Sequence, residues 1–266
     1  MLRSIFLKTL RDERKSFMWW GISISSLIIL TVFLYHSFAE SPAIDEVFQE
    51  MPEAFSKLFA GEISDITSPE GYLNSQLFVI LIPLVFLFSA IAKGSGAIAG
   101  EEEKDTIDLL LSYPVKRSRV VIDKFAAMVV AILSLGLVLW LSVAGSAIAI
   151  GMDVSVAKIA EVTLSGGLLG VTFGSLALAM GCAKGNRGLS VGVTSTLGIF
   201  SYLINALAPV SDVLEPFQKL SLFYYYIGGD PLTNGLNLGH ASVLLGVTVA
   251  LLGVALAAFE HRDLAK

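Results

Sequence analysis

The sequence has few charged residues and a single cysteine. Charged side chains make up 15% of the 266 residues, below the ~25% typical of soluble domains, and hydrophobic residues make up 55%. This composition excludes an ordinary soluble domain and indicates a membrane protein. The one cysteine, Cys182, excludes an internal disulfide and a cysteine metal cluster. Its neighbours Gly181 and Ala183 favour a small packing residue in a helix.

Motifs for nucleotide, metal and nucleic-acid chemistry are also missing. The chain has no G-x-x-x-x-G-K-[ST] loop, and the glycine-rich residues 93–100 do not match G-x-G-x-x-G. His36, His240 and His261 lie at the ends of three different hydrophobic segments, without an H-E-x-x-H motif or paired carboxylates. There is no basic tail for nucleic acid. We therefore predict no catalytic residue, no metal site and no cofactor bound by this chain.

Six long segments contain no charged residue: 16–39, 71–92, 125–152, 162–183, 188–211 and 231–259. Each exceeds the ~20 residues that a helix needs to cross the hydrocarbon core of a bilayer. The first is also longer than the ~7–15 apolar residues of a signal peptide, so we expect it to remain in the protein. We predict an all-α integral membrane protein with six transmembrane helices, at residues 17–38, 71–99, 119–151, 160–183, 188–209 and 239–260.

Lysine and arginine are distributed unequally between the two sides of these spans. If the N-terminus is cytoplasmic, all but three of the 18 basic residues lie in cytoplasmic segments, the exceptions being Lys57, Lys158 and Lys219. Cytoplasmic loops carry such an excess of positive charge. An even number of spans places both termini on the same side. We therefore expect a multi-pass protein of the cell membrane with both termini in the cytoplasm.

Three segments outside the spans have a recognisable character. Residues 1–16 carry apolar side chains at helical spacing opposite basic ones, which predicts a helix in the inner interface, close to membrane lipids. Residues 39–70 form an external loop whose apolar periodicity predicts a short amphipathic helix. Residues 210–238 contain three consecutive tyrosines and predict an external re-entrant region with short helices. An aromatic belt at the end of a span is the alternative there.

The fourth span has glycines at four-residue spacing, at positions 166, 170 and 174. Small residues at this spacing let helix backbones approach closely in a membrane. The spacing is compatible with packing inside the chain, with packing against a second copy, or with a hinge for gating.

Ionisable groups, which ion-coupled carriers keep within their spans, are missing from the six segments. The polar candidates for a translocation path are Asn74, Gln76, Thr194 and Asn205. They are weak candidates, because polar side chains in helices often bond to their own backbone. Ion-coupled transport is therefore disfavoured, and an external source of energy is the simpler hypothesis.

Residues 100–124 form a densely charged segment between the second and third spans. Ionised residues cost ~2.5–3.5 kcal/mol each at the bilayer centre, so the three glutamates at 101–103 would cost about 10 kcal/mol there. The chain has therefore left the membrane by Glu101. Ile107, Leu110 and Leu111 line the opposite helix face, and Pro114 ends the helix. This apolar stripe predicts a docking surface, with a plain charged connector as the alternative.

Residues 98–117, IAGEEEKDTIDLLLSYPVKR, resemble a segment of ABC-2 type permeases, the membrane subunits of ATP-binding cassette exporters. Residues 216–225 are similar to the external stretch of that family, and residues 259–264, FEHRDL, are similar to its C-terminal ending. The order and spacing of the three motifs extend the resemblance over essentially the whole chain.

The resemblance implies a permease subunit that forms the path of an exporter and is powered by a separate cytoplasmic ABC ATPase, which would bind ATP and Mg. It also implies a second permease copy or a paralogous permease as partner, and a coupling helix within residues 100–118. By position, the contacts to the ATPase would be Glu101, Glu102, Glu103, Thr106, Leu110, Leu111, Tyr113 and Arg117. The family often has Arg or Lys where this chain has Glu103. The alternative is a non-transport membrane protein, a sensor or an assembly factor, that recruits a cytoplasmic partner through the same helix.

Overall fold

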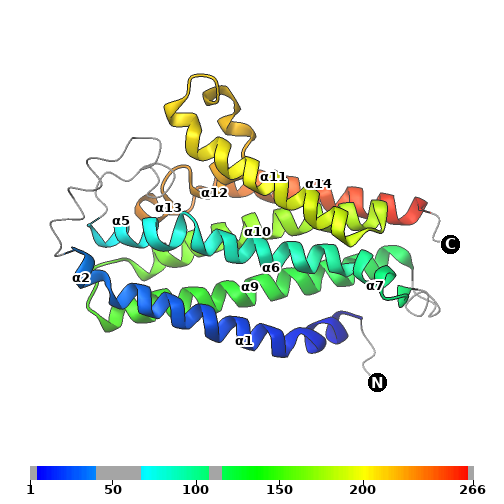
Figure 1. The fold of residues 1–266 in the computed structure, drawn as a ribbon, viewed down its shortest axis with the longest axis horizontal. Coiled ribbons are helices and arrows are strands. Elements are labelled where there is room, and N and C mark those ends of the chain that lie inside the picture. The colour runs from blue at the N-terminus through cyan, green and yellow to red at the C-terminus, as the bar shows by residue number, and fades with distance from the viewer. Residues whose placement is uncertain (1–4, 40–66, 108–115, 263–266) are drawn as a thin grey trace.

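The computed structural model describes residues 5–39, 67–107 and 116–262, and within these ranges the chain forms helices and no strands (Figure 1). Six helical segments are long and apolar enough to cross a membrane, as predicted. They are Phe17–Ala39, Pro69–Ala97, Arg117–Ala149, Val156–Lys184, Arg187–Val210 and Leu238–His261. The beginning of the first, the end of the last and the short helix α7 (Ala99–Glu103) lie at one end of the bundle (Figure 1).

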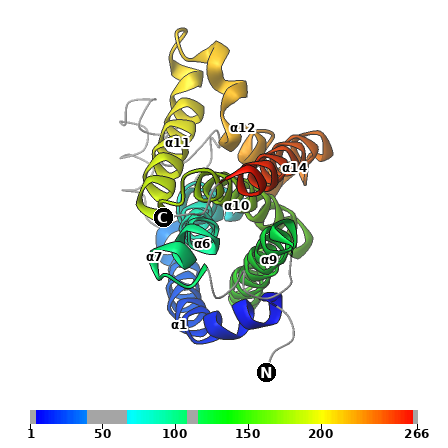
Figure 2. The same ribbon diagram turned by 90° about the vertical axis from the view of Figure 1, so that its right-hand side faces the viewer.

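The first span belongs to a helix that starts well before it. Helix α1 (Ile5–Phe33) is continuous through residue 16, and α2 (Tyr35–Ala39) completes the span. The first turns of α1 bend aside from the rest of the helix (Figure 2). Residues 40–66, which include most of the predicted external loop, lie outside the described part of the chain.

The second span is built from several pieces. It consists of α5 (Pro69–Leu73), the π-helix η1 (Asn74–Phe78) and α6 (Leu81–Ala97), after which α7 begins. Ser68 caps the first turn by accepting a hydrogen bond from the Gly71 amide, at 3.1 Å. The interruption between η1 and α6 leaves the Phe78 carbonyl outside the regular helix ladder, and such π-helical turns need compensating contacts.

Helix α10 (Val156–Lys184) is the centre of the bundle, packed against α6, α9 (Arg117–Ala149), α11 (Arg187–Leu207) and α14 (Leu238–His261) (Figure 2). Most of α10 is buried, whereas most of α1, α11 and α14 faces outward. Glycines on α10 and on α6 allow the two helices to pack this closely. A Cβ added at Gly170 would lie 3.0 Å from the Phe86 Cβ, and one added at Gly94 would collide with the Gly174 carbonyl oxygen. The glycine spacing therefore serves packing within this chain.

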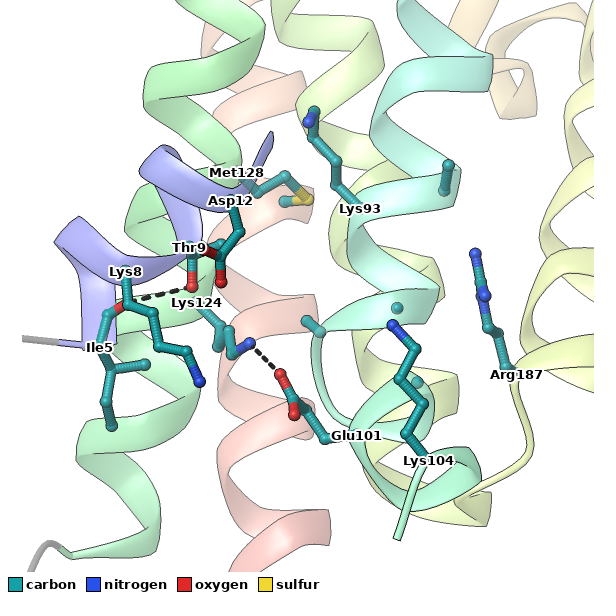
Figure 3. Close-up of a pocket in the computed structure, with 14 residues that line it drawn as sticks. Ile5, Lys8, Thr9, Asp12, Lys93, Glu101, Lys104, Lys124, Met128 and Arg187 are labelled. Carbon is teal, nitrogen blue, oxygen red and sulfur yellow. Dashed lines mark hydrogen bonds and ion pairs between the residues drawn. The ribbon is translucent and has the colours of Figure 1, made fainter. Parts of the chain in front are cut away.

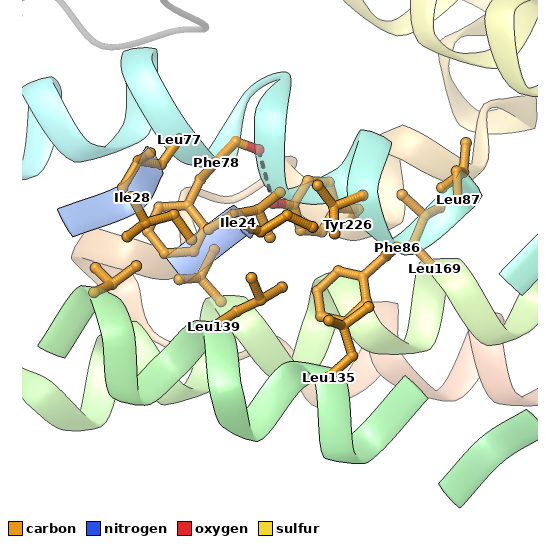
Figure 4. Packing of buried hydrophobic residues seen from close by; sticks show 14 of the residues in the cluster. Ile24, Ile28, Leu77, Phe78, Phe86, Leu87, Leu135, Leu139, Leu169 and Tyr226 are labelled. Carbon is orange, nitrogen blue, oxygen red and sulfur yellow. Dashed lines mark hydrogen bonds between the residues drawn. The ribbon is translucent and has the colours of Figure 1, made fainter. Parts of the chain in front are cut away.

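Four short helices follow α11, namely η2 (Ala208–Val210), η3 (Glu215–Leu220), α12 (Leu222–Ile227) and α13 (Pro231–Asn234). Tyr226 of α12 is buried in the core between α10 and the second span (Figure 4). Its hydroxyl donates to the Phe78 carbonyl at 2.7 Å, and Ser165 of α10 donates to the Tyr226 carbonyl at 2.9 Å. The predicted short helices of residues 210–238 are therefore present, and one of them supplies the contact that the interrupted second span needs.

Candidate functional site

The site begins at the end of the second span, where the chain bends at Ile98 and α7 follows. Helix α7 ends at Glu103 with Lys104 as its C-cap, and Asp105 adopts a left-handed conformation with φ 54°, which Asp tolerates better than most residues. Thr106 then folds back, and its hydroxyl donates to the Glu101 carboxylate at 2.6 Å. The turn thus fixes the orientation of one of the three glutamates.

Glu101 connects α7 to α9. Lys124 Nζ lies 2.6 Å from Glu101 Oε1, and the two side chains are only 9% and 21% exposed (Figure 3). Burial raises the pKa of Glu101, but hydrogen bonds from Lys124 and Thr106 outweigh it, and the pKa falls below its ordinary value of 4.5. Glu101 is therefore ionised at neutral pH and paired with Lys124.

Glu102 connects α7 to the ends of two other helices. It forms a bidentate pair with Arg262, directly after α14, at 3.0 Å for Nη1 to Oε1 and 2.5 Å for Nη2 to Oε2. Arg262 Nη1 also donates to the carbonyls of Gly181 and Cys182, at 3.4 and 3.1 Å, in the last turn of α10. The planar guanidinium can make all these contacts at once, and its charge is favourable beside a helix C-terminus.

Arg117, at the start of α9, completes the arrangement. Its Nη1 donates to the carbonyls of Arg262 and Phe259, at 2.8 and 3.4 Å, and its guanidinium lies 5.9 Å from the centre of the Phe259 ring. We define the charged cluster as Glu101, Glu102, Arg117, Lys124 and Arg262. It joins the ends of the second, third, fourth and sixth spans.

Glu103 differs from the two glutamates that precede it. Its side chain is 62% exposed, and its Oε2 lies 3.8 Å from Nη1 of Arg187, which is itself 43% exposed. Such a solvent-exposed pair contributes little to stability. Glu103 is therefore available to another molecule.

Of the predicted contacts to an ATPase, Glu101, Glu102 and Arg117 make contacts within the chain, Thr106 is half-buried, and Glu103 faces outward. Leu110, Leu111 and Tyr113 lie outside the described residues.

Sequence reasoning missed Lys124 and Arg262 as members of the cluster. A lysine directly before a long charge-free segment was a usable signal, because a charge at that depth requires a partner. No signal paired Arg262 with a glutamate 160 positions earlier.

The four polar candidates for a translocation path lie on two elements of the fold. Asn74 and Gln76 lie on η1, the first buried and the second exposed, while Thr194 and Asn205 lie on α11. The Thr194 hydroxyl is buried and has no hydrogen-bond partner in the part of the chain that the structure describes. A role for these residues in the path stays a prediction.

Comparison with known families identifies the chain. A sequence model of the ABC-2 family transporter proteins matches residues 3–264. The chain belongs to the ABC-2 transporter family. A search of curated proteins gave no match. Together with its six apolar helices, the family membership makes the protein a multi-pass membrane permease of an ABC transporter.

Proposed function

We propose that this permease forms the transmembrane path of an exporter that is powered by a separate cytoplasmic ATPase subunit. ATP and Mg would be bound by that subunit. The observation that carries the proposal is the charged cluster, because it connects α7, and the segment that follows it, to most of the bundle.

The cluster is suited to transmitting a displacement. Glu101 and Glu102 are neighbours on one short helix, yet Glu101 pairs with Lys124 of α9 and Glu102 pairs with Arg262, directly after α14. Arg262 in turn donates to a carbonyl in the last turn of α10. The pairs are largely buried, so the surrounding water screens them little. A push on residues 104–115 would therefore move α7 together with the third, fourth and sixth spans.

The orientation follows from the positive charges. Helix α7, which carries Glu101 and Glu102, lies at the end of the bundle where α1 begins and α14 ends (Figure 1), and the lysine and arginine distribution favours the cytoplasm for that end. We therefore propose that both termini lie in the cytoplasm, that the protein lies in the cell membrane, and that an ATPase contacts Glu103 and the segment that contains Leu110 and Leu111.

A second membrane subunit, either another copy or a paralogous permease, would complete the path. Helices α1, α11 and α14 present apolar side chains on their outward faces, among them Leu30, Phe200 and Val249, all more than half exposed. These faces can contact lipid or a second subunit. Closure of the two ATPases on nucleotide binding would push both coupling segments and tilt the two permeases, opening a path between them.

The proposal is tested by replacing Leu110 and Leu111 together with Asp. We expect the variant to insert in the membrane and to lose co-purification with the ATPase, because two carboxylates cannot enter an apolar interface without a large desolvation cost. Leu220→Asp is the matched control, since Leu220 is 76% exposed on η3, in the predicted external region. Retention of the ATPase by the double variant would refute the docking assignment.

A further inference from the structure

A cavity of about 340 Å³ lies beside the charged cluster (Figure 3). It is enclosed by the first turns of α1, the end of α6, α7, the start of α9 and Arg187 at the start of α11. Its lining includes five cationic side chains but only two carboxylates, those of Asp12 and Glu101. The cations are Lys8, Lys93, Lys104, Lys124 and Arg187.

The positive charge of the cavity is not balanced by its own carboxylates. Glu101 is paired with Lys124 at 2.6 Å. Among the residues that the structure describes, neither Lys8 nor Lys104, which both line the cavity, has a carboxylate within the 4 Å of an ion pair, although Lys8 interacts with Glu101 at longer range. Like charges in one cavity repel each other, so an anionic ligand would be stabilised there.

The cavity lies at the boundary between apolar and charged parts of the spans. Lys93 directly follows the charge-free segment 71–92, Lys124 directly precedes 125–152, and Arg187 directly precedes 188–211. Three spans thus meet the cavity where each one leaves its apolar stretch. Because the headgroup region of a leaflet begins where the hydrocarbon core ends, we expect the cavity to lie at the level of the lipid phosphates.

We propose that the cavity binds the phosphate headgroup of an anionic phospholipid. Its volume is within the ~300–1,000 Å³ of small-ligand pockets, and lysines bind phosphate as point charges. Basic pockets between transmembrane helices at the cytoplasmic side bind anionic headgroups in the same way. Only the choice of leaflet rests on the orientation proposed above.

Binding there would have a structural consequence. The headgroup would contact the first turns of α1 and the residue after α7 at the same time, through Lys8 and Lys104. It would therefore stabilise the folded permease, by an amount that rises with the logarithm of its concentration once the site is largely occupied.

The test uses the full chain in nanodiscs of phosphatidylcholine, with or without phosphatidylglycerol, without the ATPase. Retained lipid is counted by native mass spectrometry, and thermal stability is measured in parallel. Each lysine near an anionic surface contributes roughly five-fold in affinity, so the Lys8→Gln, Lys104→Gln double variant should lose roughly 25-fold in preference for phosphatidylglycerol. The pair Lys116→Gln, Lys184→Gln is the matched control, since both lysines are exposed and neither lines the cavity.

A second variant fills the cavity without changing its charge. A Cβ added at Gly96 would meet nothing within 4 Å, so Gly96→Leu extends into open space. Gly96→Leu should reduce the preference for phosphatidylglycerol, as the double lysine variant does. Gly145→Leu, at an equally open position on α9, should leave that preference unchanged.

Unchanged preference for phosphatidylglycerol in both cavity variants would overturn the proposal. If instead inorganic phosphate in phosphatidylcholine nanodiscs stabilises the wild type and not the cavity variants, while phosphatidylglycerol has no effect, the ligand is a soluble phosphate and not a lipid. Because the ATPase is absent, these outcomes are independent of the co-purification test.

Discussion

The pair of Glu101 and Lys124 gives a prediction whose size can be worked out from the structure. Removing one partner of a fully buried pair costs ~3–5 kcal/mol, because it leaves an uncompensated charge. Here the carboxylate keeps 21% of its exposure, so water reaches it. We expect Glu101→Gln and Lys124→Met each to lower the free energy of unfolding by ~2 kcal/mol. The double variant should lose ~2–3 kcal/mol, which corresponds to a coupling energy of ~1–2 kcal/mol.

The assay is unfolding of the purified permease in mixed micelles with increasing denaturing detergent, followed by circular dichroism. Arg119→Gln is the control, because Arg119 pairs with Asp123 at 3.0 Å but is 68% exposed. An exposed pair of this kind should contribute less than ~1 kcal/mol.

The stabilisation that the pair of Glu101 and Lys124 contributes should decrease at low pH. Because the pKa of Glu101 is lowered in the folded state, the unfolded state binds more protons as the pH falls. The contribution of the pair is therefore complete above pH 4.5, the ordinary value, and is lost as the pH falls through the lowered pKa. If the double variant at neutral pH loses as much free energy of unfolding as the two single variants together, Glu101 and Lys124 are not coupled and the reasoning is refuted.

Two packing predictions can be checked by thermal unfolding in detergent. Gly94→Ala should destabilise the bundle by ~1–3 kcal/mol, because its methyl group would collide with the Gly174 carbonyl, whereas Gly96→Ala, one half-turn along the same helix, should cause no loss. Tyr226→Phe should cost ~1–3 kcal/mol, because it leaves the buried Phe78 carbonyl without its donor; a cost below ~0.5 kcal/mol would show that the backbone there has another partner.

The number and nature of the spans could be predicted from sequence for a physical reason. In a bilayer the backbone polar groups have to be satisfied within the protein, which an α-helix does with its own hydrogen bonds, so a charge-free run of ~20 residues or more predicts a spanning helix. The interruption between η1 and α6 could not be predicted in this way. It depends on Tyr226, 148 positions from Phe78, and nothing in the second span alone specifies that contact.

The three consecutive glutamates show a similar limit at the site. In the sequence Glu101, Glu102 and Glu103 look equivalent, but successive residues of a helix point in directions ~100° apart. The first therefore meets α9, the second meets Arg262 beyond α14, and the third faces outward. The sequence predicted an acidic helix outside the membrane, and the packing of distant helix ends decided which of its side chains remain available.

The central claim is that the charged cluster transmits movement from the ATPase to the spans. The direct measurement is the distance between spin labels at Val213 and Leu238, which are 75% and 78% exposed in the predicted external region, with and without ATP in the assembled transporter. We expect an ATP-dependent change of this distance in the wild type and its loss in Arg262→Gln, although that variant still retains the ATPase. An unchanged response to ATP in Arg262→Gln would contradict it.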